Sequence, residues 1–350
     1  MQRKILPLLL IMILTVGLFS ACGQQGTPAT GNSADTSTAV RVGTGTSGQT
    51  TEGDSTQDVS DSKVTTYPLT LNDANGTPVT IKSKPVKIVS LPLGICEMLN
   101  SMVEKNEIAA MTHYVDDPVV SNIADEAKGV GQRLDFNAER IIALQPDLVL
   151  VDTWQDANIV KQLRDANINV FVTNTMTNVE QQKEMLRLLG KITNNAAKAE
   201  EIVNWMEQKL KTVSDKLAGL KDDQRLTIID YSEMGSTSGK DTNFDDVVTR
   251  AGLINPVSKE GLAGWPVLSK EMIVKYNPDI ICLPSWYYDV KVNLDSLSKS
   301  IRDDKSLAGV KAVKNNRLIT IPYNHMTTTS QYSVLGIEDM AKAAYPDLFK

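Results

Sequence analysis

Aromatic side chains gather in the predicted loops of this chain, where they could hold a ligand. Aromatic residues make up only 5% of the sequence, yet seven Trp and Tyr residues lie where a predicted strand or helix ends. Such residues offer a broad flat surface with a polar tip, which suits a large ring system. Core or hinge packing remains open for each one singly. The seven are Tyr114, Trp154, Trp265, Trp286, Tyr287, Tyr288 and Tyr323.

The two histidines of the chain do not form a metal site in the sequence. His113 lies beside Asp116 and Asp117, and His325 lies beside Met326. A zinc site needs three or four ligands in register, so we expect no directly bound metal. His113 is expected at a helix end or on the surface. His325 follows the carboxyl end of a predicted strand, where ligands of α/β proteins bind, and is a candidate for ligand contact.

A glycine-rich loop, GSTSGK at residues 235–240, looks like a phosphate-binding loop but has the wrong spacing. Three residues separate its glycines where four are needed, and Asp241 stands where Ser or Thr should bind magnesium. Thr237 also stands where a hydrolase would need a nucleophilic serine. We therefore expect neither an NTPase nor a hydrolase, and expect the loop to contribute backbone to the rim of a cleft.

The elements that must position these residues include a repeated unit. The stretch 138–154, AERIIALQPDLVLVDTW, returns without a gap as KEMIVKYNPDIICLPSW at 270–286. Each copy predicts a helix capped by Asn137 or Ser269, a Pro-Asp turn and a buried strand. Two copies this far apart predict two similar α/β lobes. A cleft between such lobes is where a small ligand would bind.

A long helix is predicted between the two copies. Apolar residues recur at spacings of three and four over residues 196–220, with Trp205 expected in the core. At about 1.5 Å per residue this helix could bridge both lobes as a rigid rod, so the cleft should close little.

The predicted fold is therefore α/β, with two lobes of mainly parallel sheet joined by this helix. We place the first lobe at 65–176, the linking helical region at 177–221 and the second lobe at 222–350. A hairpin is expected around Asn75 and Gly76. Further strands are expected at 86–91, 107–111, 170–172, 226–230 and 317–322, with helices from about residues 95 and 244 and at 333–344.

The N-terminal region predicts export and anchoring. Residues 1–21 read as a signal peptide: Arg3 and Lys4, an apolar run, then small residues. Cys22 follows Ser-Ala as in a bacterial lipobox, so it is expected to carry a lipid, although an ordinary signal peptide with a chance cysteine remains open. Residues 22–64 are small and polar and predict a flexible tether.

Composition narrows the choice of partners. The formal net charge of −6 argues against a nucleic-acid surface. Beyond Cys22 only Cys96 and Cys282 remain, one in each predicted lobe, so we expect buried thiols rather than a disulfide framework. No segment after the N-terminal one reaches the roughly 18 apolar residues of a membrane span.

Together these features resemble the extracytoplasmic solute-binding proteins of iron-siderophore, haem and vitamin B12 ABC importers (class III). The resemblance covers nearly everything after the tether. It is carried by LNDANG at 71–76, KPVKIVSL at 84–91, DVVTRAGLIN at 246–255 and the two Glu-to-Pro-Asp blocks.

The resemblance gives Glu139 and Glu271 a role, because in such proteins one glutamate of each lobe pairs with arginines of the permease. These two occupy matching positions of the repeat. Acids near a helix start are stabilised by the helix dipole and can steer onto a basic partner. They could instead serve only to stabilise their helices.

The ligand implied is a bulky metal chelate whose cobalt or iron comes with it. Residues 112–118 and 264–266 resemble segments that place a Tyr and a Trp against corrin in B12-binding members. Arg133 is placed to meet siderophore oxygens, and His325 with Met326 could be axial ligands of haem. The expected ligand-binding residues are Tyr114, Arg133, Trp154, Trp265, Trp286, Tyr287, Tyr323 and His325.

We expect a monomeric, lipid-anchored protein on the outer face of the cytoplasmic membrane. It would deliver its ligand to a permease driven by a cytoplasmic ATPase, with corrinoid ahead of ferric siderophore and haem third. A two-lobe extracellular enzyme is an alternative, but no set of acid, base and nucleophile can be assembled from this chain. A sensor or adhesion lipoprotein is another.

Overall fold

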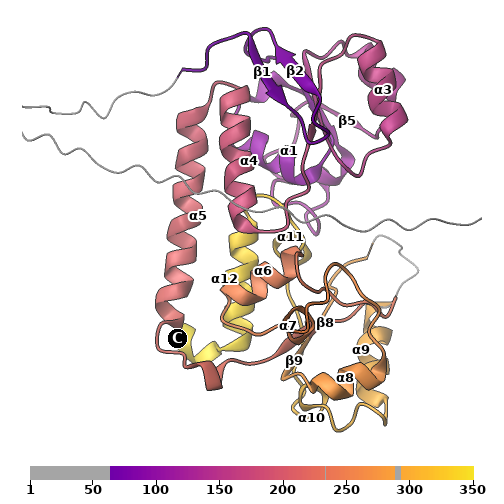
Figure 1. The fold of residues 1–350 in the computed structure, drawn as a ribbon, viewed down its shortest axis with the longest axis vertical. Helices are drawn as coiled ribbons and strands as arrows, with labels where there is room; N and C mark the ends of the chain where they lie inside the picture. The colour runs from indigo at the N-terminus through magenta and orange to yellow at the C-terminus, as the bar shows by residue number, and fades with distance from the viewer. Residues whose placement is uncertain (1–63, 233, 288–292) are drawn as a thin grey trace, which may run out of the picture. The chain divides into compact units, whose positions relative to one another are not determined.

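Two separate parallel β-sheets and a set of long helices make up the fold (Figure 1). The computed structural model describes residues 64–232, 234–287 and 293–350. The predicted signal peptide, the Cys22 lipid site, the tether before residue 64 and Tyr288 lie outside these residues. In the ranges described, no helix is long and apolar enough to cross a membrane.

The first sheet has five parallel strands in the order β5-β4-β3-β6-β7. Its central strands are buried on both faces, which is why their sequences are continuous apolar runs instead of alternating patterns. The hairpin predicted around Asn75 and Gly76 precedes it and is antiparallel. The strands are β1 (Leu69–Asn72), β2 (Pro78–Ile81), β3 (Ile88–Ser90), β4 (Ile108–Thr112), β5 (Gln132–Leu134), β6 (Leu148–Asp152) and β7 (Val170–Thr173). The helices of this part are α1 (Leu93–Asn100), η1 (Lys105–Glu107), η2 (His113–Asp116), α2 (Ala138–Ala143) and α3 (Ala157–Asp165).

The second sheet has three parallel strands in the order β10-β9-β8. The predicted strands and helices of this part are all present, with ends shifted by a few residues. The strands are β8 (Ile228–Asp230), β9 (Ile280–Leu283) and β10 (Leu318–Thr320). The helices are η3 (Asp222–Gln224), α6 (Asn243–Arg250), α7 (Pro256–Lys259), α8 (Lys270–Tyr276), α9 (Leu294–Asp303), α10 (Lys311–Lys314), α11 (Tyr323–Met326), α12 (Ser333–Ala344) and η4 (Pro346–Phe349).

The sequence repeat is a structural repeat. Its two copies form α2 with β6 and α8 with β9, as predicted. The Asn137 side chain accepts a hydrogen bond from the Arg140 N–H, and the Ser269 side chain accepts one from the Met272 N–H. Both caps satisfy an N–H group that the first turn of a helix leaves without a partner.

The aspartate of each Pro-Asp turn makes equivalent hydrogen bonds in both copies. Asp147 accepts hydrogen bonds from the backbone N–H groups of Val86 and Lys87, just before β3. Asp279 accepts one from the N–H of Thr227, just before β8. Each carboxylate therefore ties the repeated strand to its parallel neighbour, and β3 and β8 are equivalent strands.

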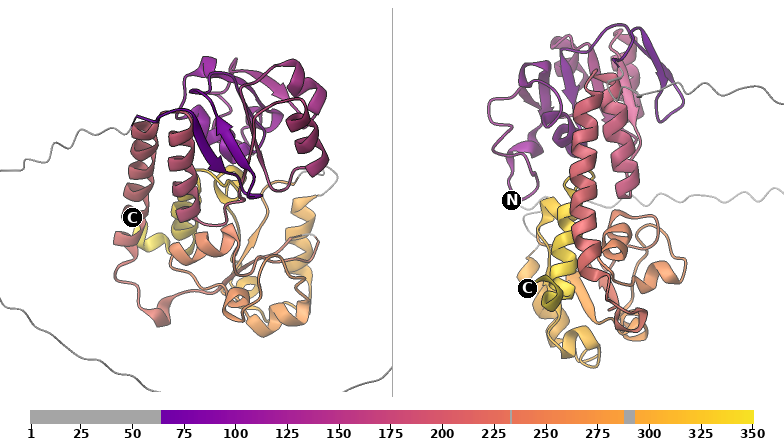
Figure 2. Two further views of the ribbon diagram at one scale, coloured as in Figure 1. Left: turned by 45° about the horizontal axis from the view of Figure 1, so that its top comes forward. Right: turned by 90° about the vertical axis from the view of Figure 1, so that its left-hand side faces the viewer.

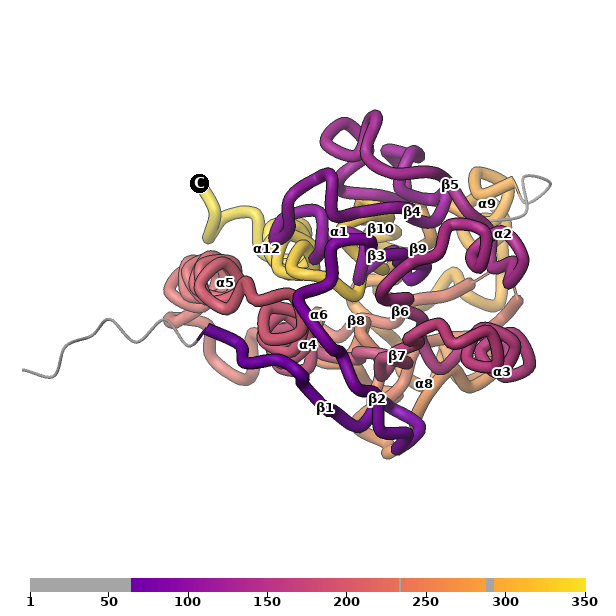
Figure 3. The backbone as a smooth tube through the Cα atoms, turned by 90° about the horizontal axis from the view of Figure 1, so that it is seen from above, coloured from indigo at the N-terminus to yellow at the C-terminus, as the bar shows by residue number. Residues whose placement is uncertain are grey.

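Two long helices, not one, join the two sheets in the chain. They are α4 (Val179–Ile192) and α5 (Ala196–Leu217), which pack side by side and appear end-on in Figure 3. The helix predicted over 196–220 ends three residues earlier, and α4 was expected only as part of a helical region. α12 packs against both α5 and α6 (Figure 2). Trp205 is only partly buried, and its ring meets that of Tyr332 edge-on at 6.1 Å between centroids.

One hydrophobic core extends through α4, α5 and α12 to both sheets. It includes Ile88 and Leu148 of the first sheet and Ile228 and Ile280 of the second. Two smaller cores lie on the other faces of the two sheets. The linking helices are therefore part of a continuous packed interior rather than a free connection.

Candidate cleft at the carboxyl ends of the strands

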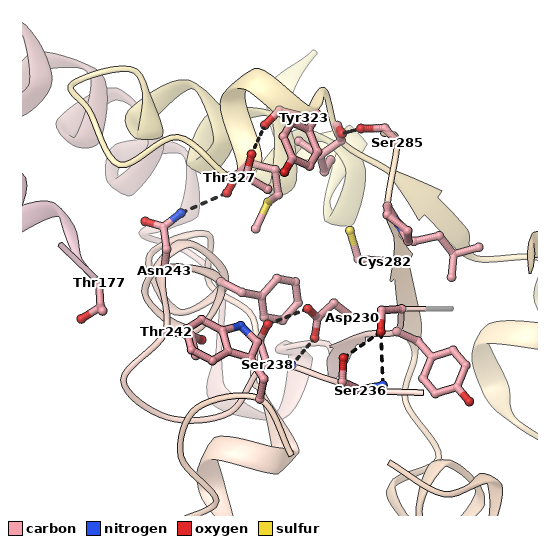
Figure 4. Close-up of a pocket in the computed structure, with 18 of the residues that line it drawn as sticks. Thr177, Asp230, Ser236, Ser238, Thr242, Asn243, Cys282, Ser285, Tyr323 and Thr327 are labelled. Carbon is pink, nitrogen blue, oxygen red and sulfur yellow. Dashed lines mark hydrogen bonds between the residues drawn. The ribbon is translucent and has the colours of Figure 1, made fainter. Parts of the chain in front are cut away.

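A cavity of about 350 Å³ lies at the carboxyl ends of β8 and β9. Asp230 ends β8 and Leu283 ends β9, and both line it. This is the sheet edge at which open α/β folds bind ligands. Figure 4 shows Asp230, Ser236 and Ser238 on one wall, with Tyr323, Thr327 and Ser285 on the opposite wall.

A second cavity, of about 430 Å³, adjoins the first. It is lined by residues at the carboxyl edge of the first sheet, including Asp152 at the end of β6. Tyr323, Thr327 and Thr329 line both cavities, so the segment that contains them forms a shared wall. We refer to these two adjoining cavities together as the cleft.

The structure brings four of the predicted ligand-binding aromatic residues to this cleft. Trp265 lines the first cavity, Tyr114 and Trp286 line the second, and Tyr323 lines both. The rings of Trp286 and Tyr323 lie 4.8 Å apart between centroids. Trp154 lines neither cavity but meets Trp265 edge-on at 6.4 Å, with 70% and 60% of the two residues exposed.

The equivalent tryptophans of the repeat therefore lie in different places. Trp286 lies inside the cleft, against Tyr323. Trp154 lies on the surface, against the Trp265 that lines the first cavity. The repeat predicts that both tryptophans follow a strand, but not which of them faces a ligand.

Arg133 does not line either cavity, so the structure does not bring it together with the aromatic residues of the cleft. Its Nε and Nη2 atoms donate to the Asp116 carboxylate at 2.8 Å each. Nη1 and Nη2 also donate to the backbone carbonyls of Val130 and Ala127 at 2.7 Å. All three guanidinium nitrogens are therefore used within the loop around β5. The acid of the ion pair, Asp116, lies 17 residues away in the sequence.

His325 and Tyr287 also lie outside the linings of the two cavities. His325 Nδ1 is 2.7 Å from Asp339 Oδ2. Met326 lines the first cavity and His325 does not, so the two do not form an axial pair facing that cavity. The Tyr287 hydroxyl donates to the Met234 sulfur at 3.2 Å. His113 starts η2 and is exposed, as predicted.

Asp230 is a site residue that the sequence analysis did not select. Its Oδ1 accepts hydrogen bonds from the Thr237 hydroxyl at 2.9 Å and the Ser238 N–H at 2.6 Å. Its Oδ2 accepts one from the Ser238 hydroxyl at 2.6 Å. Burial raises the pKa of this carboxyl above its ordinary value. A polar residue that ends a buried strand was the signal available.

The glycine-rich loop contributes side chains to the cleft as well as backbone. Ser236 and Ser238 line the first cavity. Gly239 lets the chain pass close to a neighbouring segment, because a Cβ there would lie 2.1 Å from the Leu262 carbonyl oxygen. The Gly239 N–H donates to the Gly264 carbonyl at 2.7 Å. The loop is therefore fixed against the segment that carries Trp265.

The cleft has a mainly apolar lining with scattered polar groups, and the polar groups described are not basic. Among the described residues, neither cavity is lined by Lys, Arg or His. The acids are Asp230 in the first cavity and Asp152 in the second, and burial raises the pKa of both. Hydroxyl groups of Ser, Thr and Tyr supply most of the remaining polar side-chain atoms, and aromatic rings supply part of the apolar surface. This arrangement favours a ligand whose contacting groups are neutral or hydrogen-bond donors.

The described ranges contain no cluster of three or more His, Cys, Asp or Glu side chains that could hold a metal ion. Cys96 and Cys282 are free and buried, as predicted. Burial raises the pKa of Cys96 to about 11. Burial, and then the charge of Asp230, raise that of Cys282 to about 12.

Glu139 and Glu271 lie away from the cavities. Both are exposed and occupy the first turns of α2 and α8. A hydrogen bond from Ser269 keeps the pKa of Glu271 below its ordinary value, so this side chain is anionic at neutral pH. Their pairing with a permease stays a prediction.

Known proteins of similar sequence and fold identify the family. YvrC of Bacillus subtilis, an uncharacterised ABC transporter substrate-binding lipoprotein, is 28% identical over 82% of this chain and 89% of its own. A cobalamin-binding protein of Halobacterium salinarum is 24% identical over 79% of this chain and 74% of its own.

A solved structure shares the fold. A possible iron-binding periplasmic solute-binding protein from Staphylococcus epidermidis matches with a TM-score of 0.65 and 20% identity, over 75% of this chain and all of its own. The sequence pattern of the periplasmic binding proteins matches residues 88–324, more than half of the chain. The protein is a member of the periplasmic binding protein family, the substrate-binding proteins of ABC transporters.

Proposed function

We propose that this protein captures a corrinoid in the cleft and delivers it to the permease of an ABC importer. The observation that carries the choice of ligand is the lining of the cleft, which combines aromatic rings and hydroxyl groups without a described basic residue. A corrin is a large ring system whose rim bears neutral amide side chains. Aromatic faces and hydrogen-bonding groups meet both features.

Anionic ligands fit this lining less well. Catecholate and hydroxamate siderophores, and the propionates of haem, present negative oxygens that bind best to Arg or Lys. Arg133 could have supplied such a group, but its nitrogens are committed to Asp116 and to two backbone carbonyls. Asp230 and Asp152 would also repel an anion. The relative from Halobacterium salinarum, which binds cobalamin, agrees with the choice of corrinoid.

The two cavities have the volumes of small-molecule sites and share a wall. The two adjoining cavities, of about 350 and about 430 Å³, each fall in the range of about 300–1,000 Å³ typical of small-molecule sites. The shared wall at Tyr323, Thr327 and Thr329 allows one ligand to occupy both.

Delivery would proceed through the two exposed glutamates and the N-terminal anchor. Glu139 and Glu271 would pair with basic residues of the permease, which works with a cytoplasmic ATPase. A lipid on Cys22, followed by the tether, would hold the protein at the outer face of the cytoplasmic membrane. The protein would act as a monomer.

The test is a titration of the soluble domain, from Val64 onward, followed by tryptophan fluorescence. The probes are cyanocobalamin, a ferric hydroxamate, a ferric catecholate and haemin. We expect saturable quenching by cyanocobalamin at sub-micromolar concentration, because Trp265 and Trp286 line the cleft.

Two variants locate the signal. Trp265→Ala should weaken cyanocobalamin binding at least tenfold. Trp205→Phe is the matched control, because Trp205 packs on Tyr332 and lines neither cleft cavity. It should lower the fluorescence background and leave the affinity unchanged. Tight binding of haemin or a ferric siderophore, without binding of cyanocobalamin, would refute the corrinoid assignment.

A further inference from the structure

The carboxyl group of Asp230 is not required by the architecture of the sheet. In the repeat, β3 and β8 are equivalent strands, since Ile88 pairs with Leu148 as Ile228 pairs with Ile280. Two residues further on, Ser90 ends β3 where Asp230 ends β8. The same position of the fold is therefore compatible with a serine, at the end of β3. It carries an acid only at the end of β8, beside the cavity that more hydroxyl-bearing residues line.

The carboxyl group is held in place by the loop that follows β8. Three hydrogen bonds reach it, from Thr237 and from the backbone and side chain of Ser238. The loop is fixed in turn, because the Thr237 N–H donates to the Pro266 carbonyl at 3.1 Å and the Ser232 and Ser236 hydroxyls lie 2.7 Å apart. Asp230 is thus preorganised before a ligand enters.

One acceptor position of Asp230 remains available. A carboxylate can accept about four hydrogen bonds. Oδ1 receives two and Oδ2 receives one, from Ser238. The residue lines the first cavity, and no described Lys, Arg or His lines that cavity to neutralise it. A buried carboxylate without a positive partner is stabilised by any further donor that approaches it.

We propose that Asp230 determines the specificity of the cleft by accepting a hydrogen bond from an amide N–H on the rim of the ligand. It thereby selects a ligand that carries amides over one that carries carboxylates at the same place. This assignment rests on the proposed function, since the ligand is taken to be a corrinoid. A carboxylate in place of the facing amide removes the donor and brings a second negative charge against Asp230.

The experiment compares cyanocobalamin with its isomeric monocarboxylic acids, in which one side-chain amide is hydrolysed. Dissociation constants are measured at pH 7.5 for wild type, Asp230→Asn and Asp230→Ser. We expect wild type to bind at least one isomer tenfold or more weakly than cyanocobalamin. For Asp230→Asn we expect the dissociation constant of that isomer to lie within about threefold of that of cyanocobalamin. The reason is that an amide side chain can donate a hydrogen bond to the ligand carboxylate.

The controls separate the possible failures. Asp152→Asn removes the acid of the second cavity and should leave the ratio for that isomer unchanged. Asp230→Ser copies the equivalent Ser90 and should fold, as a thermal melt would show, while losing the discrimination. If both Asp230 variants discriminated between cyanocobalamin and every isomer as strongly as wild type does, the role of Asp230 would be overturned. The corrinoid assignment would still stand. A wild type that binds no corrinoid would overturn both.

Discussion

At the scale of single residues, the two buried thiols make a direct chemical prediction. Only thiolate reacts with alkylating agents, and burial raises the pKa of Cys96 to about 11 and that of Cys282 to about 12. At pH 8 the thiolate fraction of Cys282 is about 10⁻⁴. We expect the folded domain to resist iodoacetamide at pH 8 and to take up two groups after denaturation, as mass spectrometry would show.

Cys282 has a further value as a reporter, because it lines the first cavity beside Asp230. Removing the negative charge of Asp230 removes one cause of its raised pKa. Asp230→Asn should therefore alkylate at Cys282 faster than wild type, with Cys96 unchanged as the internal control. An equal rate in both proteins would contradict the coupling.

Residue types in the sequence predicted part of the site and missed part of it. Trp and Tyr after strands gave Tyr114, Trp265, Trp286 and Tyr323, because aromatic residues in loops are uncommon without a partner. Arg133 was predicted to contact the ligand but does not line either cavity, and its pairing with Asp116 could not be read from the sequence. Asp230 was missed because one acid at a strand end has no pattern around it.

At the scale of secondary-structure elements, the repeat was predictable because each copy carries its own N-cap, turn and buried strand. The position of the segment between α11 and α12 could not be predicted from the sequence. It leaves the second sheet after β10 and returns to α1, where it forms the wall shared by the two cavities. Its sequence around residues 327–330 is polar and looks like that of an ordinary loop, because the partners that fix it, Glu97 above all, are more than 200 residues away in the sequence.

Glu97 of α1 fastens this segment from inside the protein. Oε1 accepts hydrogen bonds from the Asn122 N–H at 2.7 Å and from its side-chain amide at 3.0 Å. Oε2 accepts from the hydroxyls of Thr328, at 2.7 Å, and Ser330. Because the side chain is fully buried, Glu97→Ala would leave these donors without an acceptor. We expect a loss of about 3 kcal/mol in unfolding free energy, measured by urea denaturation.

The pH dependence of stability provides a second measurement on the same residue. Burial raises the pKa of Glu97 above its ordinary value of 4.5. The folded protein then keeps a proton that the unfolded chain releases, so this contribution to stability is present at low pH and is lost as the pH rises through the folded-state pKa.

Glu97→Gln cannot ionise and should lack this loss. Its unfolding free energy should therefore rise relative to that of wild type as the pH increases above 4.5. Glu184→Gln, at an exposed position of α4, serves as the control and should follow wild type at every pH. A constant difference between Glu97→Gln and wild type would show that Glu97 does not titrate with folding.

At the scale of the whole molecule, one core joins the two sheets through α4, α5 and α12. Closing the cleft by a large rotation would have to disturb this packed interior, which resists deformation. The ligand therefore meets a largely preformed site, and Asp230 and the Trp286–Tyr323 pair can be in place beforehand. The same packed core would also keep α2 and α8, which carry Glu139 and Glu271, in a fixed arrangement.

A fixed arrangement of α2 and α8 would make the two proposed docking glutamates a bivalent contact. If Glu139 and Glu271 each pair with the permease, the second pairing follows the first at high effective concentration. Replacing either one with alanine should reduce uptake of labelled cobalamin several-fold, and replacing both should abolish it. The measurement is uptake by cells whose own copy of the protein is replaced by each variant, at matched expression.

The ligand affinity of the same variants decides what the loss means. Both glutamates are exposed and line neither cavity, so the dissociation constant for cyanocobalamin should equal that of wild type. Glu184→Ala, which removes an exposed acid from α4, should change neither uptake nor affinity. Full uptake by the double variant would show that the two glutamates are not needed for docking.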